Sequence, residues 1–325
     1  MIDFDDVPAV GTGENLFDDI ARWVDSPPMR AVVSEFAGDS PFDWKPDLAE
    51  RLQGLDEFSA RWDTRKGKER DLAEDLPLTG DQEDLVLSAA RALGFRASRP
   101  PLYREYDHVM LLGGLFRACI TRPAHAANLL REGVVTTTSV VALGGFRPFG
   151  EQETQLAIAC GFPGLTEEFE ALDAGTRRAF DLPEPISEAG ETFDDPGSSW
   201  GVREYDEPSG TRVRVAAAPS SEPKARRANT ADSYGWFATK LAQLERGSRI
   251  LAVTTAIYVP AQQAAALRML NLEFGVDVDT VGIEPGDVVP ELAQPFTPTK
   301  YLLEIRSTIR ALRDLHAQAW PVSSN

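Results

Sequence analysis

From residue 107 onward, short apolar runs alternate with longer stretches that carry apolar residues at helical spacing. This alternation is typical of strand–helix–strand units, in which helices pack against a sheet and bury it. It predicts an α/β fold with a Rossmann-like, mostly parallel sheet and helices on both faces. The expected strands, which should be parallel neighbours in one sheet, are 108–114, 139–145, 249–255 and 276–284.

The first hundred residues show another pattern, that of short helices joined by turns. Thr79 with Gln82 three residues later has the spacing of a capping box, which opens a helix that Gly94 ends. We therefore predict a helical N-terminal region at 1–105 and a Rossmann-like domain at 106–325, with a hairpin insertion near 199–218. The helices expected in the second domain are 121–133, 151–161, 166–180, 230–247, 260–275 and 299–318.

The charge of the chain narrows the classes of partner. Its 51 acidic and 33 basic residues give a formal net charge of −18, so phosphate backbones and anionic membrane surfaces should repel it. No apolar run has the length of a membrane span, and the start MIDFDDVPAV lacks the features of a signal peptide. We expect a cytoplasmic protein that binds neither nucleic acid nor membrane.

Two similar turns point to a ligand site. The runs LLGGLFR at 111–117 and ALGGFR at 142–147 each place two glycines at the end of an expected strand and an arginine just beyond. Ligands of open α/β sheets bind at this edge, where glycine exposes backbone amides and a guanidinium can hold a carboxylate or phosphate. The turns therefore predict an anion site; a purely structural tight turn or an interface are the alternatives. The residues concerned are Gly113, Gly114, Arg117, Gly144, Gly145 and Arg147.

Two further segments should reach the same edge. Asn229 and Thr230 open an expected helix, whose N-terminus offers free amides, although they can equally serve only as its cap. Thr254 and Thr255 end the expected strand 249–255 with two hydroxyl groups.

This succession of motifs resembles the SanA, ElyC and YdcF family of bacterial proteins over residues 107–161 and 215–284. The matching stretches are HVMLLGGLFRACITRPAHAANLLREG, VVALGGFRPFGEQE, ARRANTADSYGWFATKL and RILAVTTAIYVPAQQAAALRML. The resemblance implies a Rossmann-like domain and, for one branch, nucleotide-like ligands such as S-adenosylmethionine. It also implies a polar pocket formed by Gly113, Gly114, Arg122, Gly144, Gly145, Glu153, Asn229, Thr230, Thr254 and Thr255.

Glu153 is the best candidate for a catalytic base, because a carboxylate beside Arg147 stays ionised and can accept a proton when partly desolvated. An ordinary glutamate in the first turn of a helix explains it equally well. His108, His125 and His316 lie too far apart in sequence to suggest a zinc site, and nothing indicates a particular cofactor.

We therefore expect an enzyme, a transferase or hydrolase, that acts on a small anionic molecule, such as a nucleotide-containing or phosphorylated one. The alternatives are a protein of the same fold that binds such a ligand without turnover, and an interaction module.

Overall fold

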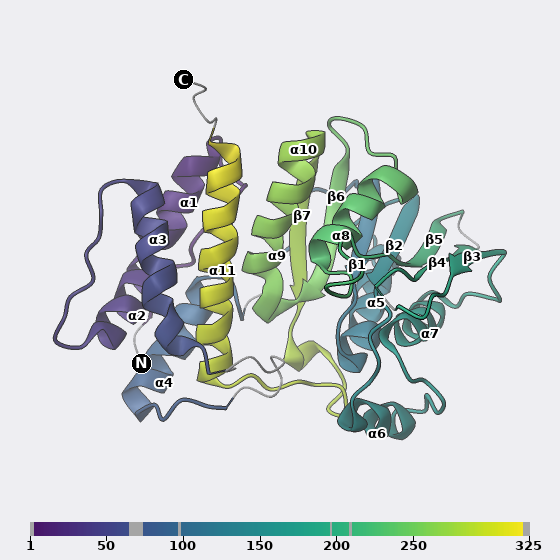
Figure 1. The fold of residues 1–325 in the computed structure, drawn as a ribbon, viewed down its shortest axis with the longest axis horizontal. Helices are drawn as coiled ribbons and strands as arrows, with labels where there is room; N and C mark the ends of the chain where they lie inside the picture. The colour runs from purple at the N-terminus through teal and green to yellow at the C-terminus, as the bar shows by residue number, and fades with distance from the viewer. Residues whose placement is uncertain (1–2, 65–73, 97–98, 196, 208–209, 321–325) are drawn as a thin grey trace. The chain divides into compact units, whose positions relative to one another are not determined.

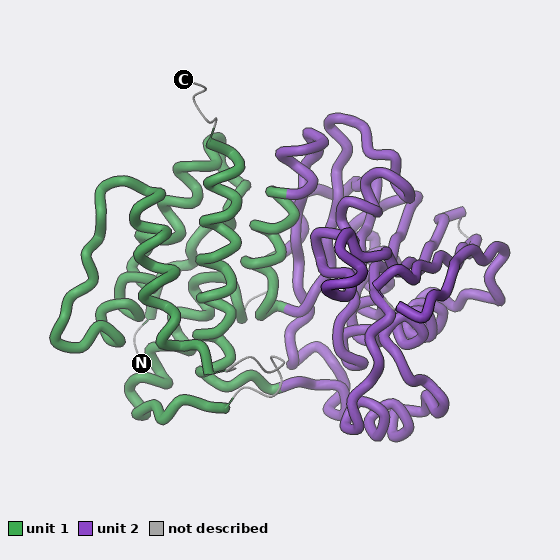
Figure 2. The backbone as a smooth tube through the Cα atoms, in the orientation of Figure 1, with its two compact units in different colours: residues 1–99, 256–268, 295–325 green, residues 100–255, 269–294 purple. Residues whose placement is uncertain are grey.

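The computed structural model describes residues 3–64, 74–96, 99–195, 197–207 and 210–320. The chain divides into two compact units, each formed by separate stretches of sequence (Figure 2). Unit 1 comprises residues 1–99, 256–268 and 295–325, and unit 2 comprises residues 100–255 and 269–294. The sequence had suggested one division near residue 105, whereas the helical unit also takes in two later stretches.

Unit 1 is helical, and its N-terminal helices confirm the expected helical region. The long helix α11, Pro298–Ala319, packs against α3, α4 and α9, and Leu302, Ile305 and Ile309 on it are fully buried. The capping box at Thr79 and Gln82 is present at the start of α4. The other α-helices described in this unit are α1 (Leu16–Val24), α2 (Pro27–Ala37), α3 (Leu48–Ser59), α4 (Gly80–Ala92) and α9 (Val259–Ala266).

Unit 2 contains a seven-stranded sheet, counted over the described residues, in the order β3-β4-β5-β2-β1-β6-β7 (Figure 1). The four expected strands are parallel neighbours, which confirms the predicted mostly parallel sheet. The expected hairpin forms as the antiparallel pair β4 and β5, and β5 also pairs in parallel with β2, so the hairpin extends the main sheet. The strands are β1 (His108–Leu112), β2 (Ser139–Gly144), β3 (Ser187–Glu191), β4 (Trp200–Asp206), β5 (Arg212–Ala217), β6 (Arg249–Thr255) and β7 (Asp277–Ile283).

Helices cover both faces of this sheet. On one face, α5 (Phe116–Arg131) and α7 (Glu168–Phe180) pack on each other and on the central strands. They bury one apolar cluster with alternate strand residues such as Val109, Val140 and Val213. On the other face, α8 (Thr230–Trp236) and the π-helical turn 237–241 bring Phe237 against His108, with 5.6 Å between ring centroids. The remaining α-helices described in this unit are α6 (Glu151–Ala159) and α10 (Leu272–Phe274).

Two helix boundaries differ clearly from the prediction, and the expected helix 260–275 is interrupted by the π-helical turn Leu267–Asn271. Helix α5 begins at Phe116 rather than near Thr121, and Pro123 lies inside it. The expected helix 230–247 keeps α-helical geometry only to Trp236, after which the turn becomes π-helical and ends near Gln243, which has a positive φ of 50°. In both places tertiary packing outweighs the local helix signals.

None of the helices in the described ranges combines the length and the apolar character that crossing a bilayer requires.

Candidate functional site

The two glycine turns meet at the carboxyl edge of the sheet, which we define as the edge where the parallel strands end. Leu112 of β1 pairs with Leu143 of β2, and the Gly113 amide donates to the Leu143 carbonyl over 2.7 Å. A Cβ at Gly113 would lie 2.9 Å from that oxygen and 3.0 Å from the Gly144 Cα. Only glycine fits this close approach.

Arg147 bridges the two turns. It donates to both oxygens of Glu153, over 2.7 and 2.9 Å, and to Glu168 Oε2 over 3.1 Å. It also donates to the Gly114 carbonyl over 3.0 Å. One cation is thus shared by two carboxylates and a carbonyl, and its side chain is 21% exposed.

Glu153 occupies the first turn of α6 and accepts several hydrogen bonds. Besides Arg147, the Phe116 amide donates to it over 2.9 Å and the Gly150 amide over 3.3 Å. Burial by itself would raise the pKa of Glu153, but the donors outweigh it and the pKa is lowered. Glu153 therefore stays ionised, holds Arg147 and ties the start of α5 to that of α6.

Glu168, which the sequence analysis did not single out, is the second carboxylate of the site. It begins α7, and its backbone amide donates to the Arg147 carbonyl over 2.9 Å. Its Oε1 lies 2.5 Å from the position that a Gly113 Cβ would take, so the carboxyl group fills the space beside that glycine. Burial raises the pKa of Glu168 to about 7 against the opposing effect of Arg147 and Arg122, and the side chain is 13% exposed. We call the group of Glu153, Glu168, Arg147 and the two glycine turns the carboxyl-edge site.

The other two predicted arginines are held by backbone carbonyls. Arg122 is buried; it donates to the carbonyls of Leu112 and Gly113, and its Nε and one terminal nitrogen donate to Thr255 Oγ1 over 3.2 and 3.0 Å. Arg117 donates to the carbonyls of Glu291 and Ala293 over 2.8 Å each. Arg122 thus joins β6 to the site, whereas Arg117 anchors the segment before residue 295.

The threonine and asparagine residues predicted for the site differ in their surroundings. Thr255 lies at the site through Arg122, and the neighbouring Thr254 points to the opposite face of the sheet and is buried. Asn229 caps α8 by accepting from the amides of Ala231 and Asp232, which occupies its side-chain oxygen.

One turn beyond Thr230, Tyr234 is fully buried within electrostatic reach of Arg122. Burial raises the pKa of its hydroxyl, and Arg122 opposes this.

Among the described residues, no group of three His, Cys, Asp or Glu side chains is placed to hold a metal ion.

The comparisons with known proteins correct the resemblance drawn from the motifs. The family model that matches is described as the Rv3785 N-terminal domain and covers residues 8–94. Two relatives, the uncharacterized proteins Rv3785 of Mycobacterium tuberculosis (strain H37Rv) and Mb3814 of Mycobacterium bovis, are each 31% identical over 334 residues. These alignments cover 95% of this chain and 90% of each relative. No solved structure matches the chain significantly.

The SanA, ElyC and YdcF assignment is therefore wrong. Its motifs, glycine pairs after parallel strands and arginines at the following helices, belong to tight turns that many unrelated α/β proteins share. The identity and the coverage of the relatives show instead that this chain belongs to the family of the mycobacterial protein Rv3785.

Proposed function

We propose that this chain is a cytoplasmic enzyme, a transferase or hydrolase, that acts on a small anionic molecule at the carboxyl-edge site. Nucleotide-containing and phosphorylated molecules are the candidate substrates. The observation that carries the proposal is the Glu168 carboxyl group, held beside Gly113 with a pKa of about 7. A group of this pKa exchanges protons most effectively near neutral pH.

Glu168 suits general acid–base chemistry. In its ionised form it can take the proton from an attacking hydroxyl group or water, and the resulting carboxylic acid can return that proton to the leaving group. Arg147 supports this role, because its Nε is fixed 3.1 Å from Glu168 while Glu153 holds its other nitrogens. Glu153 as the base stays a prediction; its lowered pKa makes it the weaker proton acceptor and favours a positioning role.

Open space beside the second turn supports the approach of a ligand. A Cβ built on Gly145 would meet nothing within 4 Å, whereas one on Gly144 would come within 3.0 Å of Leu172. A ligand can therefore come close to the backbone at Gly145.

The net charge of −18 supports the expectation that nucleic acid and membranes are not partners, because both are negatively charged.

The test combines ligand binding with turnover. The full chain is screened by thermal shift against nucleotides, S-adenosylmethionine and sugar phosphates, since a ligand at 100 times its Kd adds about 2.7 kcal/mol to the free energy of unfolding. Stabilising compounds are then incubated with the protein and their products identified by mass spectrometry.

Glu168→Gln should keep the thermal shift and lose turnover by about 10²- to 10⁴-fold. The matched control is Glu151→Gln, which removes an exposed carboxylate from the first turn of α6 and should leave both measurements unchanged. Undiminished turnover in Glu168→Gln would reject the assigned base.

A second candidate function is ligand binding without catalysis. It is favoured by the open space beside Gly145, which admits a ligand, while Arg117, Arg122 and Arg147 all donate to protein oxygens already and so have little capacity to stabilise a reacting anion. In that case a compound stabilises the chain and its Glu168→Gln variant equally, and no product forms.

A further inference from the structure

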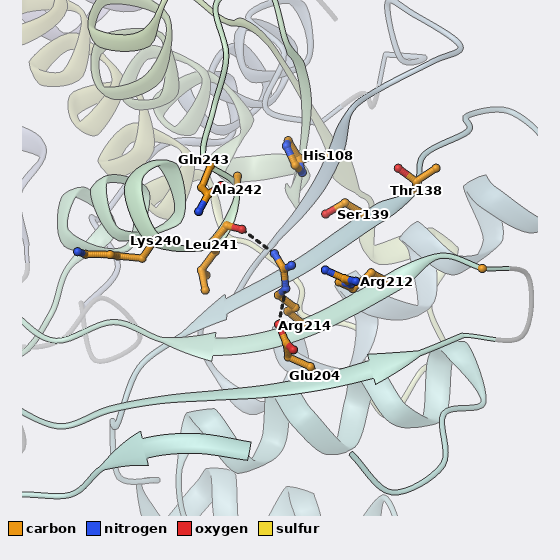
Figure 3. Close-up of a pocket in the computed structure, with 11 residues that line it drawn as sticks. His108, Thr138, Ser139, Glu204, Arg212, Arg214, Lys240, Leu241, Ala242 and Gln243 are labelled. Atoms are coloured by element: carbon orange, nitrogen blue, oxygen red, sulfur yellow. Dashed lines mark hydrogen bonds and ion pairs between the residues drawn. The ribbon is translucent and has the colours of Figure 1, made fainter. Parts of the chain in front are cut away.

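A polar pocket of about 580 Å³ lies at the opposite end of the same sheet, where β1, β2 and β5 begin (Figure 3). Ser139 of β2 pairs with Arg212 of β5. Val109 of β1 pairs with Val140 of β2, so the residues before them, His108 and Ser139, are also level with each other. His108, Ser139 and Arg212 therefore form one row across three strands. Their neighbours Val109, Val140 and Val213 face α5 and α7. The row therefore faces the other side of the sheet. The lining residues are His108, Thr138, Ser139, Glu204, Gly210, Arg212, Arg214, Lys240, Leu241, Ala242 and Gln243.

The lining is cationic, although the chain as a whole is strongly acidic. It contains Arg212, Arg214 and Lys240 against one carboxylate, Glu204. Arg214, two residues after Arg212 on β5, shares its sheet face, and Figure 3 shows both guanidinium groups in the pocket, with Lys240 reaching outward. The lining is thus more basic than the chain as a whole, whose net charge is −18, although Asp206 pairs opposite Arg212 and Asp107 acts on His108 from outside the lining.

The three cations differ in their partners. Arg214 donates to Glu204 Oε1 over 2.8 Å and to the Leu241 carbonyl over 2.6 Å, as the dashed lines in Figure 3 indicate. Arg212 and Lys240 make no side-chain hydrogen bond or ion pair with any described residue, and both are exposed. The pocket therefore holds two exposed cations that are available to a ligand, and a third, Arg214, that is fixed in place and keeps one terminal nitrogen without a hydrogen bond among the described residues.

His108 adds an unsatisfied polar atom to the pocket wall. Its Nδ1 is buried and has no hydrogen-bond partner among the described residues. Burial lowers the pKa of the ring, Asp107 opposes this and Arg214 adds to it, so the imidazole is neutral at pH 7 and presents one donor and one acceptor. A buried polar atom without a partner costs free energy that a bound polar molecule can recover.

We propose that this pocket binds a phosphate monoester. Its phosphoryl group lies against Arg212 and Arg214, and the polar alcohol portion of the ester points toward His108. Three cations against one carboxylate leave two positive charges, which match the charge of about −1.5 to −2 that a phosphate monoester carries near pH 7. The guanidinium fork forms paired, charge-assisted hydrogen bonds with phosphoryl oxygens, and the Ser139 hydroxyl group is a further donor. The pocket and the carboxyl-edge site use different residues, so either assignment can fail alone.

Calorimetric titration of the full chain compares two dianionic probes, glycerol 3-phosphate and succinate. We expect glycerol 3-phosphate to bind more tightly, and Arg212→Gln to weaken its binding about tenfold or more, as expected for a lost hydrogen bond between charged groups. Lys240→Gln, at the rim, should weaken binding less. The matched control is Arg178→Gln, which removes an exposed arginine from α7 on the other side of the sheet and should leave the affinity unchanged.

Three results would overturn the proposal. The first is that neither probe binds at millimolar concentration, and the second is that succinate binds as tightly as glycerol 3-phosphate. The third is that Arg178→Gln weakens binding as much as Arg212→Gln does, which is the result expected if overall charge alone attracts the probe. Thermal unfolding of each variant checks that it is folded. Because Arg212 is exposed at the first position of β5, its replacement should leave the fold intact.

Discussion

Single residues of the carboxyl-edge site were predictable to different degrees. Gly113 and Gly144 follow apolar runs, and a glycine pair at a strand end is a local signal that short-range pattern analysis detects. Glu168 carries no such signal, because it lies far from Gly113 in the sequence and only the packing of α7 brings its carboxyl group to that turn. Local pattern thus locates the turns, and tertiary packing determines which side chains reach them.

The raised pKa of Glu168 predicts a pH-dependent contribution to stability. Between the ordinary value of 4.5 and about 7, the unfolded chain has lost this proton and the folded chain keeps it. The contribution of the protonated group is therefore fully present below pH 4.5 and is lost as pH rises toward 7. The difference in the free energy of unfolding between the parent chain and Glu168→Gln should fall over this window, by at most about 3 kcal/mol.

Urea denaturation of both proteins at a series of pH values measures this difference, with Glu151→Gln as the control. A difference that stays constant across the window would show that Glu168 titrates normally.

Among the elements, the strands with continuous apolar runs were predicted well and the polar one was missed. The runs at 108–114, 139–145 and 249–255 lie in β1, β2 and β6 because buried parallel strands are apolar throughout. The sequence SEAGE of β3 has no apolar alternation, and all five of its residues are exposed, so only backbone pairing with β4 makes it a strand. Helix α5 begins at Phe116 rather than near Thr121, so Pro123, a residue type more usual in the first turn of a helix, lies in its interior.

The close packing of α5 on α7 depends on Gly175. Pro123 has no N–H to donate to the Cys119 carbonyl one turn earlier, and Gly175 of α7 lies against that carbonyl. A Cβ at Gly175 would overlap the Cys119 oxygen and lie 3.1 Å from the Ile120 Cα. Gly175→Ala should therefore lower the free energy of unfolding by about 1 to 3 kcal/mol, the usual cost of overpacking a core.

The matched control for this prediction is Gly235→Ala in α8, where an added Cβ meets nothing within 4 Å. That substitution should be neutral or stabilise by about 0.5 to 1 kcal/mol, since alanine favours a helix over glycine. Chemical denaturation measures both, and equal effects of the two substitutions would contradict the steric explanation.

At the scale of the whole molecule, the compact helical unit is larger than the match to the Rv3785 N-terminal domain. The family model covers residues 8–94, whereas unit 1 also includes 256–268 and 295–325. Helix α11 supplies fully buried side chains to this unit, among them Leu302, Ile305 and Leu312. The N-terminal stretch alone therefore lacks a large part of its apolar core.

A fragment of residues 1–99 should consequently not fold cooperatively, because it cannot bury the surfaces of α3 and α4 that α11 covers. We expect low helicity by circular dichroism and a gradual, non-sigmoidal response to urea, in contrast to the full chain. A sharp unfolding transition of the fragment would show that the later stretches are dispensable.

The exposed strand β3 has a consequence for how copies of this chain behave at high concentration. It is the outermost strand of the sheet at one end, so its outer backbone groups are open to another strand. It is only five residues long and carries Glu188 and Glu191, and a second copy added in register would bring like charges together. The two glutamates of β3 and the net charge of −18 therefore oppose edge-to-edge aggregation. They favour colloidal stability without a helix that covers this edge.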